Sequence, residues 1–175
     1  MAVAALDIAL LLLALLGAAW GTIVVHEGGH YLMAFSFGVP AGSRRLRMER
    51  PPHVALRQGD RWLSPDDPQY ASAFAQHNPS MFAAWMFVAG GVLVETVLML
   101  FIAALCRGFG SLSLVIVGAS TALLLMYLVA DVALSLQRRR PYGDFGAMFT
   151  IARGPTVVTI MVVLLVRTVA IFLLV

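Results

Sequence analysis

The sequence has little charge and almost no cysteine. Of its 175 residues, 12% are charged and 61% are hydrophobic, and the mean hydropathy is +0.89. Because a soluble domain is typically about a quarter charged, this composition excludes an ordinary soluble domain and indicates an integral membrane protein. Cys106 is the only cysteine, so an internal disulfide and a metal site built from several cysteines are both excluded.

Four apolar runs are long enough to cross a bilayer as helices, at residues 4–37, 81–106, 112–136 and 155–175. A polar interfacial loop at 38–78 and a second break at 137–153 separate them. The first run lacks the positively charged start of a signal peptide, so we expect it to be a retained membrane helix. The predicted fold is an all-α integral membrane protein, a single membrane domain over residues 1–175.

The polar loop contains one indication of β structure. Residues 54–58 and 61–64 flank Gly59-Asp60, a pair typical of tight hairpin turns. We therefore expect a small β-hairpin at the membrane interface. An isolated hairpin is marginal in water, so the helices, the bilayer or a bound extended peptide must support it.

Lysine is absent, and all 12 basic residues are arginine. In a four-span chain the loops at 38–78 and 137–153 lie on the same side of the membrane, and they hold ten arginines, whereas the opposite side has Arg107 alone. The positive-inside rule therefore places both loops in the cytoplasm and both termini outside. The expected location is the cytoplasmic membrane of a prokaryote, and membrane topology explains the arginines better than nucleic-acid binding does.

The most informative motif is His26-Glu27-Gly28-Gly29-His30, inside the first apolar run. On a helix, His26 and His30 lie on one face and can bind one metal ion. Glu27 is displaced by about 100° around the helix axis, so it can reach a water at the metal without being a ligand. Ionisable side chains in a membrane span are costly and usually functional, and this set fits one Zn²⁺ with a carboxylate base.

A catalytic zinc site needs a third protein ligand. Asp131 and Asp144 both lie on the side of the membrane where the first span ends, whereas His53 and His77 would have to fold back from the polar loop. Asp144 has glycines on both sides after Pro141, so we expect irregular backbone there, followed by a short helical piece at 147–152. Irregular backbone adjusts to a metal more readily than a regular helix and favours Asp144, although Asp131 stays possible.

These motifs resemble those of the site-2 proteases, intramembrane zinc metalloproteases that cleave membrane-anchored proteins. The chain is similar to the family over residues 20–150, at the His-Glu-x-Gly-His motif, at residues 89–91 and at residues 141–146. The resemblance implies a three-helix core with zinc held by His26, His30 and Asp144, and Glu27 as the catalytic base. The resemblance is to a small form of the family, in which we expect no PDZ or CBS domain. Three family features differ: Gly91 replaces a proline, Phe145 separates Asp144 from the following glycine, and an asparagine is missing from the third motif.

Two other classes of function stay open from the residues alone. One is a zinc-binding membrane scaffold without catalysis, which would not need Glu27. The other is a transporter or channel subunit, in which ionisable residues from several spans line a polar path. The candidates for such a path are Asp7, Glu95, Asp131 and Arg167.

Overall fold

The computed structural model describes residues 2–49, 51–109 and 111–174, with side chains from residue 8 onward, so Asp7 and Val175 lie outside the described side chains. Among these residues, four helices are long and apolar enough to cross a membrane. This finding confirms a mostly helical chain with several membrane-length helices. The four are α1 (Ala2–Ser36), α3 (Met81–Leu105), α4 (Leu112–Arg138) and α6 (Arg153–Leu174).

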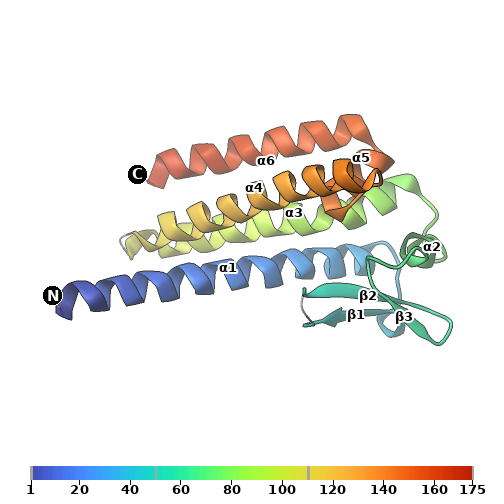
Figure 1. The fold of residues 1–175 in the computed structure, drawn as a ribbon, viewed down its shortest axis with the longest axis horizontal. Coiled ribbons are helices and arrows are strands. Elements are labelled where there is room, and N and C mark those ends of the chain that lie inside the picture. The colour runs from blue at the N-terminus through green and yellow to red at the C-terminus, as the bar shows by residue number, and fades with distance from the viewer. Residues whose placement is uncertain (1, 50, 110, 175) are drawn as a thin grey trace.

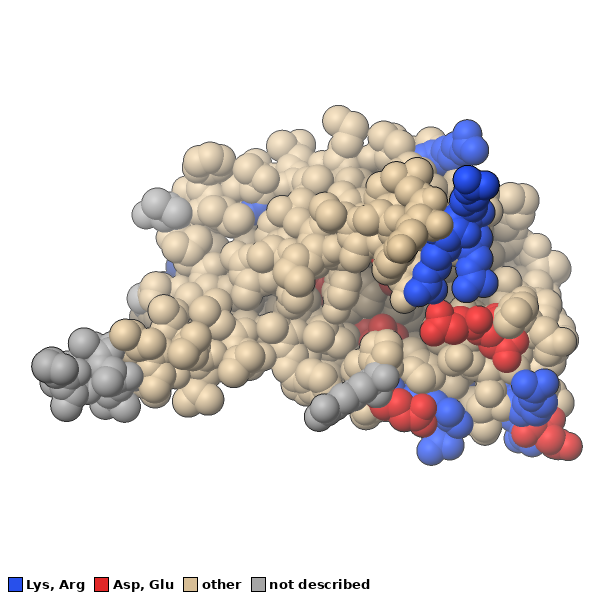
Figure 2. All heavy atoms as spheres, in the orientation of Figure 1, with Lys and Arg blue, Asp and Glu red and all other residues tan. Residues whose placement is uncertain are grey.

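The long helices lie side by side, with α3 and α4 between α1 and α6 (Figure 1). The start of α1 and the end of α6 lie at one end of the bundle. The three strands and the two short α-helices lie toward the other end. Most of the charged side chains visible in Figure 2 lie at that second end as well, and only a few charged atoms are visible on the rest of this face. The two arginine-rich loops therefore share one end of the molecule.

The loop after α1 forms a three-stranded antiparallel sheet in the order β1-β2-β3. The predicted hairpin is confirmed as β2 (His53–Gln58) and β3 (Arg61–Leu63), joined at Gly59, whose φ of +60° suits glycine. The third strand, β1 (Arg44–Arg47), pairs with β2 and was not predicted. Its sequence, Arg-Arg-Leu-Arg, has the composition of a solvated loop, so the pairing comes from tertiary contacts.

The sheet is fixed to the end of α1 by a buried apolar cluster that also includes helix α2 (Tyr70–Ala75). Arg44 donates a hydrogen bond to the carbonyl of Val39. Its guanidinium lies 4.9 Å and 4.8 Å from the ring centres of Tyr31 and Phe35. The sheet and α2 thus cover the part of α1 that carries the histidine motif. The cluster comprises Ala34, Val39, Val54, Leu56, Leu63, Ala73, Phe74, Ala83 and Phe87.

Helices α1 and α3 approach each other through glycine. A Cβ atom on Gly29 would overlap the backbone of Gly90 and Gly91, whereas a Cβ on Gly28 would meet nothing within 4 Å. A Cβ on Gly91 would lie 2.5 Å from Nε2 of His30 and 2.7 Å from Nε2 of His26. The two helices can therefore contact at backbone distance only because these positions have no side chain.

We expect Gly29→Ala to destabilise the protein and Gly28→Ala to leave it intact or slightly more stable. An added methyl at Gly29 separates α1 from α3, and such overpacking typically costs about 1–3 kcal/mol. At Gly28 the same methyl faces open space, and alanine favours helix by about 0.5–1 kcal/mol. Thermal unfolding of both variants in detergent measures the difference. Equal unfolding midpoints would contradict the close α1–α3 contact.

The segment after α4 differs from the irregular loop that the sequence predicts around Asp144. Arg139 has a φ of +51° and ends α4, and a new helix, α5 (Gly143–Ile151), begins four residues later, before the predicted helical piece at 147–152. Asp144 therefore lies in the first turn of a regular helix. The carboxylate of Asp131 on α4 accepts a hydrogen bond from the backbone N–H of Phe145 at 3.0 Å, and this contact caps the start of α5.

Candidate metal centre

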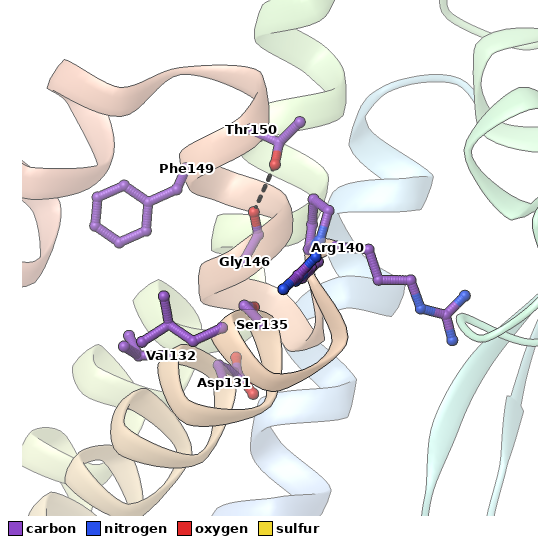
Figure 3. Close-up of a pocket in the computed structure, with 10 residues that line it drawn as sticks. Asp131, Val132, Ser135, Arg140, Gly146, Phe149 and Thr150 are labelled. Carbon is purple, nitrogen blue, oxygen red and sulfur yellow. Dashed lines mark hydrogen bonds between the residues drawn. The ribbon is translucent and has the colours of Figure 1, made fainter.

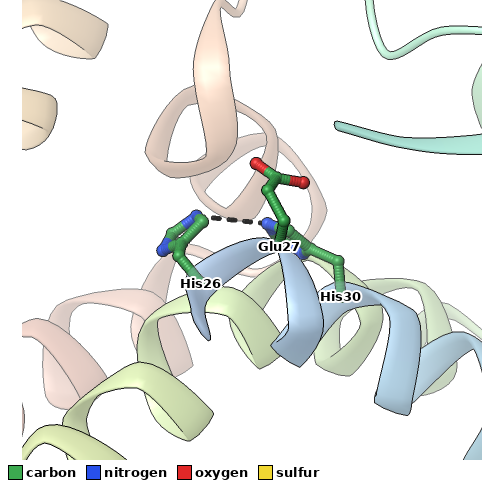
Figure 4. Close-up of side chains that lie close together, drawn as sticks. All are labelled: His26, Glu27 and His30. Carbon is green, nitrogen blue, oxygen red and sulfur yellow. Dashed lines mark hydrogen bonds between the residues drawn. The ribbon is translucent and has the colours of Figure 1, made fainter. Parts of the chain in front are cut away.

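Two histidines of α1 face α3 with their rings close together. His26 and His30 are one helical turn apart and each is 7% exposed. Their Nε2 atoms are 3.2 Å apart and the rings meet edge to face (Figure 4). The ring of Phe87 packs on His30, and that of Tyr127 from α4 packs on His26. These contacts fix both ring orientations, so both Nε2 atoms point to one place.

Asp144 of α5 adds a carboxylate to this pair. Its Oδ2 lies 2.8 Å from Nε2 of His26 and 3.0 Å from Nε2 of His30. Donor atoms in a tetrahedral zinc site are about 3.3 Å apart, given bonds of ~2.0–2.1 Å. The three donor atoms therefore form a triangle whose sides are slightly shorter than the distances between donor atoms in a zinc site. One tetrahedral position stays open for a fourth ligand. The structure brings together all three residues predicted to bind metal.

The hydrogen-bond partners of the two histidines indicate which nitrogen of each ring carries the proton. Nδ1 of His30 lies 2.9 Å from the carbonyl oxygen of Phe87, and Nδ1 of His26 lies 3.1 Å from Oε2 of Glu95. Both partners accept hydrogen bonds, so each neutral ring donates from Nδ1 and presents a lone pair at Nε2. Two nitrogen lone pairs and a carboxylate oxygen then face one point with no hydrogen between them. A divalent cation satisfies all three, so these residues fit Zn²⁺.

Asp144 is in the form that binds metal. Burial raises the pKa of its carboxyl, but without a metal the charge of protonated His30 and the hydrogen bonds donated by His26 and His30 outweigh burial and hold the pKa well below its usual range. A bound cation would take the place of those protons and favour the carboxylate in the same way. The side chain keeps 34% of its exposure and so faces the open side of the site. Asp144 is therefore a carboxylate at neutral pH.

Glu27 lies beside the histidines without entering the triangle. A carboxylate oxygen of Glu27 and one ring nitrogen each of His26 and His30 lie within 4.8 Å of one another. Glu27 also faces a cavity of about 60 Å³ that has room for water. Figure 4 shows its carboxylate on the same side of α1 as the two rings. The carboxylate is thus placed to take a proton from a water at the site. The cavity is lined by Glu27, His30, Val54, Pro65, Tyr70, Phe87, Val88 and Asp144.

Asp131, the alternative ligand, has a different contact in the structure. Its carboxylate accepts a hydrogen bond from the backbone N–H of Phe145. The same carboxylate lies so close to Gly143, whose φ is +66°, that a Cβ atom on that residue would overlap it. Asp131 also lines a cavity of about 370 Å³ between α4 and α5, outside the histidine cluster (Figure 3). Asp131 therefore holds the turn that presents Asp144. The predicted preference for Asp144 over Asp131 stays a prediction until metal binding is measured.

The remaining histidines of the polar loop lie elsewhere. His53 is on β2, with Nδ1 3.1 Å from the carbonyl of Pro51, and His77 follows α2. The cluster of metal-compatible side chains found among the described residues includes neither.

The sequence analysis missed two partners of the metal-site histidines. The carbonyl of Phe87 has no sequence signal at all, because any residue carries one. Glu95 did have a signal, since it is an acidic residue inside an apolar span, but its partner could not be identified. In the structure Glu95 binds Arg167 and His26. Glu95, Arg167 and Asp131 thus have partners within the bundle, which gives no support to a polar transport path lined by them.

Comparison with known proteins gave no match: no family model, no curated protein and no solved structure is significantly similar to this chain. The candidate function therefore depends on the residues of the site and their geometry.

Proposed function

We propose that the protein is an intramembrane zinc metalloprotease that hydrolyses a peptide bond in or near a transmembrane segment of a membrane-anchored protein. The observation that carries this proposal is the triangle of His26 Nε2, His30 Nε2 and Asp144 Oδ2, with Glu27 beside it. Both histidines of the triangle come from α1, a helix long and apolar enough to cross a membrane, and the aspartate comes from α5 beside it. A substrate that reaches the site must therefore itself enter the bilayer or its interface.

The residues of the site have separate roles in this proposal. His26, His30 and Asp144 would hold Zn²⁺, which when bound would supply Lewis-acid chemistry by polarising a carbonyl and making water acidic enough to react near neutral pH. Glu27 takes a proton from the attacking water and then delivers it to the leaving amine. Buried Phe87 and partly buried Tyr127 shield one side of the two histidines from bulk water.

Substrate access requires movement of the loop between α1 and α3. The cavity beside Glu27 has a volume of about 60 Å³, which is too small for a peptide segment. Its outer wall is formed by Val54, Pro65 and Tyr70, and the Tyr70 hydroxyl donates to the carbonyl of Val54 at 2.6 Å. A helical substrate must also unwind, because its peptide bonds are shielded by hydrogen bonds. We propose that displacement of α2 and β2 opens the site.

The proposed orientation places the sheet, α2 and α5 in the cytoplasm, in accordance with the arginine distribution. A cysteine introduced at Ser64, in a variant without Cys106, is then expected to resist an impermeant thiol reagent added outside intact cells. Labelling from outside would reverse the orientation and move the opening of the site to the other face of the membrane.

The proposed function is tested by metal content and cleavage. Purified protein is expected to contain about one zinc ion per chain, as a site with three protein ligands binds one ion. It should cleave a membrane-anchored reporter, and a chelator should stop cleavage until zinc is restored. Bound zinc without cleavage of any membrane-anchored substrate would favour a scaffold role. Absence of zinc under all metal-loading conditions would overturn the proposal.

A further inference from the structure

Glu95 and Arg167 form an ion pair inside the helical bundle. Glu95 is 0% exposed and Arg167 is 1% exposed, and Oε1 of Glu95 lies 2.6 Å from Nη2 of Arg167. Removing two charges from water is costly, and a buried pair is often no more stabilising than apolar residues of the same volume. Bundle stability alone is therefore a weak explanation for this pair.

The guanidinium of Arg167 is held on three sides. It donates to Oγ1 of Thr96 from Nη2 at 2.9 Å and from Nε at 3.2 Å, and to Oγ of Ser120 from Nη1 at 3.0 Å. These contacts connect α6 to α3 and α4. The guanidinium therefore has a defined position, and it fixes the orientation of the Glu95 carboxylate.

The second oxygen of Glu95 is directed at the metal centre. Oε2 lies 3.1 Å from Nδ1 of His26, on the opposite side of that ring from Asp144. A carboxylate in this place keeps the proton on Nδ1, leaves the lone pair on Nε2 and makes the imidazole a stronger metal ligand. His30 has a neutral carbonyl in the equivalent place, so the two histidines differ in their support.

We propose that Glu95 is a positioning residue for the metal site, and that Arg167 on α6 sets its orientation. This inference rests on the proposed zinc site at His26, His30 and Asp144. It assigns a function to α6, which is the last described helix and contributes no ligand of its own. The chain of contacts runs from Arg167 through Glu95 to His26.

The chain offers a matched control for a purely structural role. Trp85 of α3 donates to Oγ1 of Thr156 on α6 at 3.0 Å. Both side chains are buried, and this bond joins the same two helices without contacting His26. Thr156→Val therefore removes a buried α3–α6 hydrogen bond and leaves the ligands unchanged.

The test is zinc titration of the metal-free protein in detergent, with the visible spectrum of the Co²⁺-substituted protein as a second readout. Glu95→Gln is expected to weaken zinc binding about 10–100-fold, the usual effect of removing a partner of a histidine ligand. It should also change the Co²⁺ spectrum. Thr156→Val should bind zinc as the unchanged protein does, even if it unfolds at a lower temperature.

Glu95→Gln leaves the charge of Arg167 without its partner, so the variant could fail to fold. The double variant Glu95→Leu/Arg167→Met removes both charges and the acceptor for His26 Nδ1, and it is expected to show the same loss of zinc affinity. Wild-type zinc affinity in either folded variant would overturn the positioning role while the proposed metalloprotease stands. If the unchanged protein binds no zinc, the proposed function fails and this inference fails with it.

Discussion

Glu27→Gln is expected to abolish peptide cleavage while zinc stays bound. Glutamine has nearly the same shape as glutamate but cannot accept the proton of the attacking water. General acid–base catalysis typically contributes about 10²–10⁴-fold in rate, and cleavage should fall at least that far. Zinc content should not change, because the three proposed ligand atoms come from His26, His30 and Asp144.

The measurement is cleavage of a membrane-anchored reporter together with zinc content of the same purified sample. Glu49→Gln is the matched control, since its carboxylate lies on the surface with 64% exposure and pairs with Arg47 at 3.4 Å. That control should cleave at the normal rate. Cleavage that persists in Glu27→Gln would rule out the base role, and loss of zinc in the same variant would make Glu27 a ligand.

Asp144→Ala is expected to lose zinc and activity together, whereas Asp131→Asn retains most of both. Oδ2 of Asp144 is within 3.0 Å of both histidine nitrogens, so its removal takes away one of three protein ligands. Asp131 acts through the backbone N–H of Phe145, and the amide oxygen of asparagine can accept the same hydrogen bond. Loss of a ligand should reduce zinc affinity far more than the ~10–100-fold typical of a supporting contact.

Zinc titration of the two variants decides between the aspartates. A loss in Asp131→Asn with normal binding in Asp144→Ala would exchange their roles. Equal and large losses in both variants would mean that the hydrogen bond to Phe145 depends on the charge of Asp131. Thermal unfolding without metal separates that case from a general loss of folding.

The local features of the fold could be predicted from the sequence because each depends on residues close together in the chain. A run of about 20 apolar residues indicates a membrane-length helix whatever surrounds it, and Gly59-Asp60 between two short β-prone stretches indicates a hairpin. The spacing of His26 and His30 places both rings on one face of any helix. The structure confirms these local predictions in helices α1, α3, α4 and α6 and in the β2–β3 hairpin.

Only the tertiary structure decided how the site is completed, because its parts come from distant segments. Asp144 was expected on irregular backbone, but it lies in the first turn of α5, because Asp131 caps that helix and Gly143 admits the close contact. The arginine-rich β1 forms a strand only because its backbone pairs with β2 and because Arg44 packs on two aromatic rings of α1. The pairing of Glu95 with Arg167 joins residues 72 positions apart, and no local pattern specifies it. Charges inside an apolar bundle must find partners, but which partner each finds is set by how the helices pack.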